Sequence, residues 1–543
     1  MLNTLCKPGV FFVKYAVLLI MAGSLCVHGY AEESGTEGDN SSASYQITAV
    51  TYSIKGMTRQ YPLSRAVPID KTRLFHSAEE LELYIDELKQ KFTNIRVIQS
   101  VEIQADYQEA GNENIIPVTL SISVTDTWNF IAVPYPSFDS NSGFELKIKM
   151  QDFNFVGTLQ PLKADIVYRS TETNESHFSS ALRFSLPFSA KMFDMLWNTN
   201  FELLYAYKAA PEIRLGSGLE ASYKAHKHVT VAFGIAPELV INDHSAEPIT
   251  DSVLPKKESG EYTGTDRRDL LGYLYPHDRY YFKTTFFTYM PILITEVNHF
   301  GALVWTPGAN IGGNWAFDGI QANKLKAWSL KWEHSLSLSQ VNWIGNFRKG
   351  LSFSLGNSYS YQFYKDKKMN ISFDTAVSGY YPFVDRVGIY GRMQFFYNLF
   401  NTTTAKAGIA MRGILNKRIH TDTAFSFNLD IPIRIATLDF ERITGIEWTR
   451  VFNCDIHFSP FLDIAVTHDK KTGRYYHPAD GWYAGGLEVI VYPQKMRSIY
   501  VRASAGFDLA ELKNVPGINK IRGRAKRDGE SITEIFIGIG VHY

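Results

Sequence analysis

Runs of alternating polarity occupy most of the chain and constrain its fold more than any other feature. From Trp128 to Tyr543, segments of about ten residues in which apolar and polar side chains alternate are separated by turns. We count 16 to 18 such segments, and clear examples lie at 144–150, 178–188, 201–208 and 387–400. Because successive side chains of a strand point to opposite faces, each segment predicts a strand with one apolar and one polar face.

These segments predict a mainly β chain. The stretch 127–543 is long enough for a 16-stranded antiparallel transmembrane β-barrel, within a range of 16–18 strands, and it contains no convincing long amphipathic helix. A soluble all-β array also fits the alternation. The Tyr and Phe residues at strand ends favour the transmembrane barrel, in which aromatic residues form girdles at both interfaces. An even number of strands would place both ends of the barrel on the same side.

The N-terminus has the features of an export signal. Lys7 and Lys14 precede an apolar stretch, and small residues suitable for cleavage end at Ala31. A retained membrane anchor is the alternative, but the apolar stretch of 13 residues is short of the roughly 20 that span a bilayer. We therefore expect a signal peptide at 1–31 and an acidic linker at 32–44.

Charge and cysteine content exclude several classes of protein. Lys plus Arg and Asp plus Glu are equal at 55 each, so no basic excess points to a nucleic acid partner. Cys6 and Cys26 lie in the leader, so only Cys454 would remain, and we expect no disulfide framework or cysteine-rich metal site. The chain has no His-Glu-x-x-His, Gly-x-Ser-x-Gly or phosphate-binding glycine loop. We therefore expect no enzyme, with no catalytic residues, cofactor or metal.

Residues 45–126 predict a small α+β domain ahead of the barrel. Ser77 and Glu80 form a capping box. The helix that follows carries one apolar stripe, made of Leu81, Tyr84, Ile85, Leu88 and Phe92. Alternating strands lie before the helix and after it, and the sheet they form would leave edges open for a partner strand.

The last nine residues alternate sharply. The residues expected to face lipid are Ile537, Ile539, Val541 and Tyr543. This ending is similar to the insertion signal of bacterial outer-membrane barrels. Gly538 and Gly540 lie on the opposite face. The family resemblance given below implies a seam between the first and last strands, which these glycines would leave weakly packed.

One segment, 407–414, interrupts the alternation and is followed by five candidate strands. Its Met411-Arg412-Gly413-Ile414 resembles the Val-Arg-Gly-Phe/Tyr motif on the inward-folded sixth extracellular loop of the BamA-type outer-membrane assembly and two-partner-secretion superfamily, also called bacterial surface antigens. Two of the four positions differ from that motif.

Other passages resemble the same family. They are Asn428-Leu429-Asp430 and Phe461-Leu462-Asp463, similar to its twelfth and thirteenth strands, and 154–158, similar to a turn near the barrel start. Residues 45–126 resemble a polypeptide-transport-associated (POTRA) domain through their opening at 45–50, their turn at 55–58 and the passage 88–97.

An arginine on a loop folded into the barrel needs partners, because desolvating its charge unpaired costs several kcal/mol. Guanidinium is planar, carries five donors and can hold two carboxylates at once. We therefore predict that Arg412 bridges Asp430 and Asp463 and so fixes the loop to the barrel wall, with Gly413 allowing a close approach. The alternative is that Arg412 lies on a solvated loop.

The resemblance implies a location and a function. It places the chain in the outer membrane of a diderm bacterium with the N-terminal domain in the periplasm. That domain would capture an unfolded outer-membrane or secreted polypeptide and pass it to the barrel seam or lumen for assembly, insertion or translocation. Outer-membrane lipid and, optionally, accessory periplasmic lipoproteins are further implied partners. The alternative function is a passive porin or surface adhesin, which would need neither the N-terminal domain nor the loop motif.

Overall fold

The computed structural model describes most of the chain beyond its first 43 residues. The described ranges are 44–109, 115–139, 143–170, 176–206, 211–243, 279–298, 300–320, 325–326, 328–363, 369–401, 403–415, 418–470, 472–495, 500–511 and 533–539. The expected signal peptide, nearly all of the expected linker, and Gly540, Val541 and Tyr543 lie outside these ranges.

A small α+β module forms the N-terminal part of the described chain. Its four strands lie in the order β2-β1-β4-β3, with β1 parallel to β4 and β3 antiparallel to it. The elements are β1 (Ser44–Lys55), α2 (Gln60–Ala66), β2 (Leu74–Phe75), α3 (Ala78–Asn94), β3 (Ile98–Tyr107) and β4 (Ile115–Asp126). Beyond Gln46, β1 pairs only with β4 within the described residues, so its other edge is open.

Helix α3 begins where the capping box predicts. The Ser77 hydroxyl accepts a hydrogen bond from the Glu80 N–H at 3.1 Å, while the Glu80 carboxylate reaches back to the His76 N–H at 2.9 Å rather than to that of Ser77. The five residues of the predicted apolar stripe are the ones that α3 buries. They pack on the sheet against Ile47, Leu120 and other apolar residues in one core.

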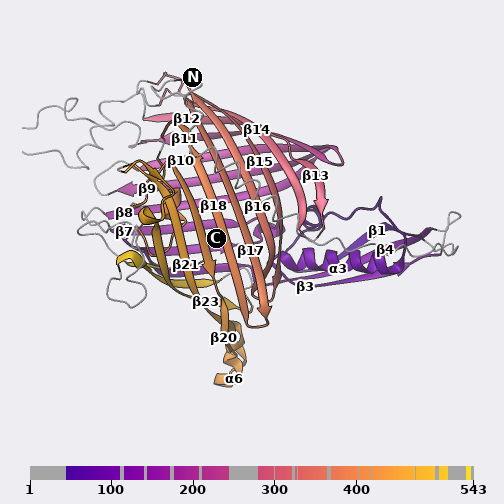
Figure 1. The fold of residues 1–543 in the computed structure, drawn as a ribbon. Helices are drawn as coiled ribbons and strands as arrows, with labels where there is room; N and C mark the ends of the chain where they lie inside the picture. Colours follow the sequence, from indigo (N-terminus) through magenta and orange to yellow (C-terminus); the bar gives the residue numbers. More distant parts are fainter. Residues whose placement is uncertain are drawn as a thin grey trace, which may run out of the picture.

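The rest of the described chain forms an antiparallel ring that closes as a barrel (Figure 1). Its strands are β5 (Phe130–Asp139), β6 (Gly143–Asp152), β7 (Leu162–Ser170), β8 (Ser176–Ala190), β9 (Phe193–Ala206), β10 (Glu212–His226), β11 (Val229–Ile241), β12 (Tyr280–Tyr289), β13 (Ile292–Val297), β14 (Gly301–Trp315), β15 (Ser329–Ile344), β16 (Phe347–Gln362), β17 (Met369–Val384), β18 (Val387–Asn398), β19 (Thr423–Asp430), β20 (Ile433–Leu438), β21 (Cys454–Asp469), β22 (Arg474–Tyr475), β23 (Trp482–Pro493), β24 (Val501–Asp508) and β25 (Thr533–Ile539).

These labelled strands correspond to 18 passages of the described chain along the barrel wall. Strands β12 and β13 are two parts of one passage, because both pair with β11 and β14. Strands β19 and β20 share one passage for the same reason, and the two-residue β22 pairs only with the end of β21. The number is the upper limit of the expected range and two more than the single figure of 16, since alternation in sequence does not show where one strand ends and the next begins.

Short helical turns connect some of the strands. They are η2 (Phe155–Gly157), η4 (Leu399–Asn401), α5 (Lys406–Ile409), α6 (Phe440–Thr444), η6 (Glu447–Phe452), η7 (Pro478–Asp480) and η8 (Leu509–Glu511). No helix in the described part of the chain is long and apolar enough to cross a membrane.

The ring closes through a short ladder. Among the described residues, β25 meets β5 only where Phe536 lies opposite Asp139 and Ile537 opposite Phe138. On its other edge, β25 pairs with β24 along its whole length, from Thr533 to Ile539. Fewer backbone hydrogen bonds therefore hold the closing junction than its neighbour.

The barrel wall has the inverse polarity of a soluble sheet. Along β21 the buried side chains at alternate positions include Asp455, His457, Ser459 and Asp463. Large apolar residues are instead exposed on the outer face of many strands, including Leu215, Phe233, Phe286, Trp305, Trp332, Leu355, Phe373, Met393, Phe425, Leu487 and Ile537. Water is a poor environment for such a surface.

The module lies at one end of the barrel and contacts turns far apart on the ring (Figure 1). The Arg59 N–H donates to the Gly157 carbonyl in the β6–β7 turn at 2.8 Å. The Asn94 side-chain oxygen accepts from the Trp343 N–H, near the β15–β16 turn, at 3.2 Å. These two turns are eight passages apart in the ring of 18, so the module bridges the barrel end.

Two of the sequence motifs meet at this joint. The Asp126 carboxylate accepts from the N–H groups of Met57 and Thr58 at 2.8 and 2.9 Å. The Asn154 amide donates to the Thr58 hydroxyl at 2.7 Å. Gly157 has φ +74°, and a Cβ there would lie 1.8 Å from the Met57 carbonyl oxygen. The turn 55–58 of the module therefore fits directly onto the first turn of the barrel.

Candidate functional site

The loop between β18 and β19 folds into the barrel. Met411 and Ile414 are almost completely buried on either side of Arg412 and Gly413. They belong to an apolar cluster with Phe396, Ala407, Ile419, Ala424, Ala465, Trp482 and Ala484, which come from the loop and the neighbouring strands. This packing stabilises the loop on the inner face of β19, β21 and β23.

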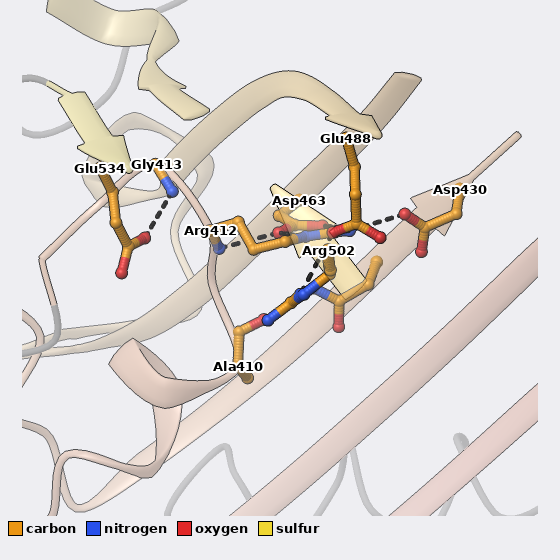
Figure 2. Close-up of polar contacts among 9 residues, drawn as sticks. Ala410, Arg412, Gly413, Asp430, Asp463, Glu488, Arg502 and Glu534 are labelled. Carbon is orange, nitrogen blue, oxygen red and sulfur yellow. Dashed lines mark hydrogen bonds and ion pairs between the residues drawn. The ribbon is translucent and has the colours of Figure 1, made fainter. Parts of the chain in front are cut away.

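Arg412 lies between Asp430 and Asp463 (Figure 2). Its Nη1 donates to Asp430 Oδ1 at 2.6 Å, and its Nη2 and Nε donate to the two Asp463 oxygens at 2.8 and 3.0 Å. The Arg412 N–H also donates to Asp463 Oδ2 at 2.8 Å. With only 5% of the residue exposed, the guanidinium makes a bidentate pair with one carboxylate and a single contact with the other.

The surroundings of Arg412 extend the charge network. Its Nη1 is 3.8 Å from Glu488 Oε2, and the same oxygen accepts from Arg502 Nη1 at 3.1 Å. The Arg412 Cζ lies 3.9 Å from the centre of the Phe461 ring, a distance suited to a cation–π contact. Burial alone would lower the pKa of Arg412, but the carboxylates of Asp463 and Asp430 outweigh it and raise that pKa, so the side chain keeps its charge.

Beneath the motif, two residues on the inner face of the wall are glycines and have no side chain. Asp430, Phe461, Gly486, Gly506 and Glu534 are successive partners across five neighbouring strands, β19, β21, β23, β24 and β25. The two glycines leave room between Phe461 and Glu534 for the loop backbone. The strand register therefore brings the two glycines side by side, at the place where the loop backbone packs on the wall.

Gly413 lies in the space that these two glycines leave. Its φ is +87°, and a Cβ on it would lie 2.6 Å from the Phe507 nitrogen. A Cβ on Gly506 would lie 2.6 Å from the Gly413 Cα, so both positions require glycine for this approach. The Gly413 N–H donates to Glu534 Oε2 on β25 at 2.7 Å (Figure 2). The loop tip thus contacts the strand that closes the ring.

Two further polar pairs hold the part of the loop between the motif and β19. Arg418 Nη1 donates to Asp508 at 2.8 Å, and both side chains are about fully buried. His468 Nδ1 lies 2.9 Å from the Asp422 carboxylate and stacks on Tyr475, with ring centres 3.9 Å apart. Sequence reasoning missed these pairs, as it missed Glu488, Arg502 and Glu534. For Glu488, Arg502, Asp508 and Glu534 the signal was a charged residue at an inward position of an alternating strand. Arg418 and Asp422 lie in the loop, where no alternation marks them.

The sequence-predicted residues do not all meet at this site. Ile537 lies on the outer face of β25 and is exposed, whereas Gly538 is buried on the inner face. The backbone of Ile539 ends β25. The Asn428 amide, from one of the family-like passages, donates to the Ala410 carbonyl at 2.7 Å. Within the described ranges no group of three or more His, Cys, Asp or Glu side chains is arranged to hold a metal ion.

Comparison with known proteins gives likenesses in structure alone. No family model matches the chain, and no curated protein matches it in sequence. CdiB from Acinetobacter baumannii is 10% identical with a TM-score of 0.46, over 91% of this chain and 73% of that one. BamA from Haemophilus ducreyi, in a structure lacking POTRA domains 1–3, is 12% identical with a TM-score of 0.36, over 90% and 84%.

A third likeness is to CdiB from Escherichia coli, which is 10% identical with a TM-score of 0.37, over 95% of this chain and 92% of that one. BamA, which gives its name to the sequence resemblance, is thus among the structural neighbours. At these identities and TM-scores the likeness carries no argument about activity, so any proposed activity depends on the contacts within the chain itself.

Proposed function

We propose that this chain is an outer-membrane β-barrel that moves polypeptides into or across that membrane. Its placement in a membrane is supported by the inverse polarity of the wall. A closed ring satisfies its backbone hydrogen bonds internally, which lipid demands, and the exposed apolar residues of the strands then meet lipid. The module, at the end of the barrel where both β5 begins and β25 ends, faces the periplasm.

Polypeptide handling is supported by one combination of features: a barrel with a loop held inside it, closed by a short ladder and bridged by a small module with an open sheet edge. The open edge of β1 beyond Gln46 is the capture site. An extended client segment adds to this edge through main-chain hydrogen bonds. Residues 45–126 then act as a POTRA domain, with accessory periplasmic lipoproteins as optional partners.

The client passes from the module to the β25–β5 seam or to the lumen. At the seam, an incoming strand can replace the few hydrogen bonds that join β25 to β5, so that no backbone group is left bare in lipid. The Arg412 contacts hold the loop in place while this happens, and Gly413 links the loop to β25 through Glu534. A passive porin would need an open lumen, and the buried loop and the bridging module both oppose free diffusion.

Photo-crosslinking in cells tests the proposal. A photoreactive amino acid at Ser53, on the open edge of β1, is expected to capture unfolded outer-membrane or secreted polypeptides. The same photoreactive amino acid at Glu82, on the exposed face of α3, is the control and captures few. Depletion of the protein then separates the two routes, because loss of other outer-membrane barrels indicates insertion and loss of an exported protein indicates translocation.

Two results together would contradict the proposal. One is an outer-membrane and secreted proteome that stays unchanged after depletion. The other is a steady single-channel conductance of the purified barrel in planar bilayers, which is typical of a passive pore.

A further inference from the structure

The turn between β20 and β21, residues 439–453, projects from the end of the barrel and carries α6 and η6 (Figure 1). Five of its six large apolar side chains are exposed; Phe440 is the half-buried one. Ile443 is 65% exposed and Trp448 66%. The others in this set are Ile446, Val451 and Phe452. A patch of this kind on an ordered turn marks a contact surface.

The inside of the same turn is polar and hydrogen-bonded. The Asn453 side-chain oxygen accepts from the Phe440 N–H at 2.8 Å, and Asp439 Oδ1 accepts from the Arg442 N–H at 3.2 Å. The hydroxyls of Thr444 and Thr449 are 2.8 Å apart, and Thr449 is buried. Hydrogen bonds inside the turn therefore fix its conformation. Like the barrel wall, it buries polar groups and exposes apolar ones.

The exposed apolar surface continues onto the wall. Ile435, on the β20 strand that leads into the turn, is 61% exposed. At the other end, Asp455 accepts from the Asn346 amide at 2.7 Å, and Asn346 follows β15 in the turn whose Gly345 carbonyl accepts from Arg96 of the module. The turn thus lies at the periplasmic end of the barrel, level with the module joint and continuous with the outward face of β20.

We propose that residues 439–453 form an interfacial anchor that lies in the periplasmic leaflet of the outer membrane. This inference rests on the proposed membrane placement of the barrel. Trp448 and Phe452, whose rings are in edge contact at 5.7 Å, occupy the headgroup level that aromatic side chains prefer. Ile443 and Ile446 enter the outer part of the acyl chains, to a depth of about 5–10 Å.

The charges of the anchor indicate which lipid property it recognises. Asp439, Glu441 and Glu447 nearly balance Arg442 and Arg450, and Arg450 Nε lies 3.8 Å from Glu441. A surface without a basic excess gains little from anionic headgroups. The anchor therefore binds through burial of apolar area, and its insertion depends little on the charge of the lipid.

Quenching by brominated phospholipids tests the anchor in the full mature chain. With Cys454→Ala as background, single cysteines replace Ile443 or Trp448 and carry an environment-sensitive fluorophore. The protein is placed in phosphatidylcholine vesicles in which bromine lies either near the headgroup or near the acyl chain end. We expect strong quenching of both probes by the shallow bromine and weaker quenching by the deep one.

Two matched probes complete the design. Leu355→Cys, on the outer face of β16, reports whether the wall is in lipid, and it should be quenched by the deep bromine. Leu83→Cys, on α3 of the module, is as exposed as Trp448, at 66%, and should not be quenched by either lipid. All four positions are exposed, so the substitutions leave the core of the protein intact.

The outcomes separate the two proposals. If the Leu355 probe is quenched while the probes at 443 and 448 behave like the one at 83, the anchor is wrong and the membrane barrel stands. If the Leu355 probe also escapes quenching, the proposed function fails. If the probes at 443 and 448 are shielded only when the protein-to-lipid ratio rises and dimers form, a second copy covers the turn, and the anchor is again wrong.

Discussion

At the scale of single residues, the interior of the barrel depends on charges that have been taken out of water. Arg412 and its carboxylate partners are nearly inaccessible to solvent, and each stays favourable only while the others are present. Removing one member of such a buried network leaves an uncompensated charge, which costs far more than the intact pair contributes. The exposed pair Arg183 and Glu202, on β8 and β9, has no such dependence.

Arg412→Ala is therefore expected to lower the free energy of unfolding of the barrel by about 3–5 kcal/mol. Urea titration monitored by heat-modifiable gel mobility would measure it. Arg183→Ala is the control and should change stability by less than about 1 kcal/mol. The triple variant Arg412→Met, Asp430→Asn, Asp463→Asn removes the charges together and should recover part of the loss. Equal stability of Arg412→Ala and the native chain would refute the role of the network.

Gly413→Ala should release the loop tip. A Cβ at this position has to overcome the positive φ and also the contact with the Phe507 nitrogen. Gly473→Ala is the matched control, since Gly473 has φ +68° and a Cβ added there would meet no atom within 4 Å, and it should cost only about 1–2 kcal/mol. Limited proteolysis between β18 and β19 would report the release. If the two variants unfold and are cleaved alike, the close approach to Gly506 has no energetic weight.

At the scale of elements, the junctions on the two edges of β25 differ in strength. Among the residues that the structure describes, the ladder with β24 runs the length of the strand, while the ladder with β5 covers two positions. A strand held so unequally separates first on the weaker edge. The proposed exchange with a client strand requires this edge to open and does not require the other.

A disulfide across the seam should stop client handling. Phe138→Cys with Ile537→Cys places the two cysteines directly opposite each other, within the distance range of a disulfide. Ala503→Cys with Ile537→Cys forms the control bridge to β24 and shares one of the two positions. Both pairs are made in a Cys454→Ala background. Depletion of client proteins that is specific to the oxidised seam pair, and reversed by a reductant, is the expected result; equal effects of the two bridges would argue against seam opening.

At the scale of the whole molecule, the module and the barrel form a joined body. The module contacts the barrel at the β6–β7 turn and again near the β15–β16 turn, on opposite parts of the ring. At the second place, the Arg96 guanidinium stacks on Trp343 at 4.4 Å and donates to the Gly345 carbonyl at 3.3 Å. Movement of the module away from the barrel end must break this contact or the Asp126 joint.

Arg96→Ala should loosen the module without unfolding it. The lost stacking is worth about 0.5–2 kcal/mol, too little to disrupt either the α+β core or the barrel. Spin labels at Glu82 of the module and at Asn357 of β16 should show a broader distance distribution in the variant. Arg73→Ala, which removes a contact internal to the module, serves as the control. An unchanged distribution would show that the remaining contacts, the Asp126 joint and the hydrogen bond between Asn94 and Trp343 among them, are enough to fix the module.

Sequence patterns could predict which helices and strands form better than they could predict which of them lie side by side. The stripe on α3 and the alternation along β21 are local, so each is readable without knowledge of the fold. Arg412, Asp430 and Asp463 could be singled out because a resemblance named their positions. Glu488, Arg502 and Glu534 could not, since their proximity depends on which strands pair and in what register. The strand number was open for the same reason.

The hydrogen bond from Gly413 to Glu534 makes the loop and the closing strand thermodynamically dependent on each other. Whatever free energy the bond contributes to keeping the loop seated, it contributes equally to keeping β25 in position, because such coupling is reciprocal. A force that displaces the loop therefore also weakens the position of β25. In the proposed function, a client strand that opens the seam at β25 would in the same way loosen the loop.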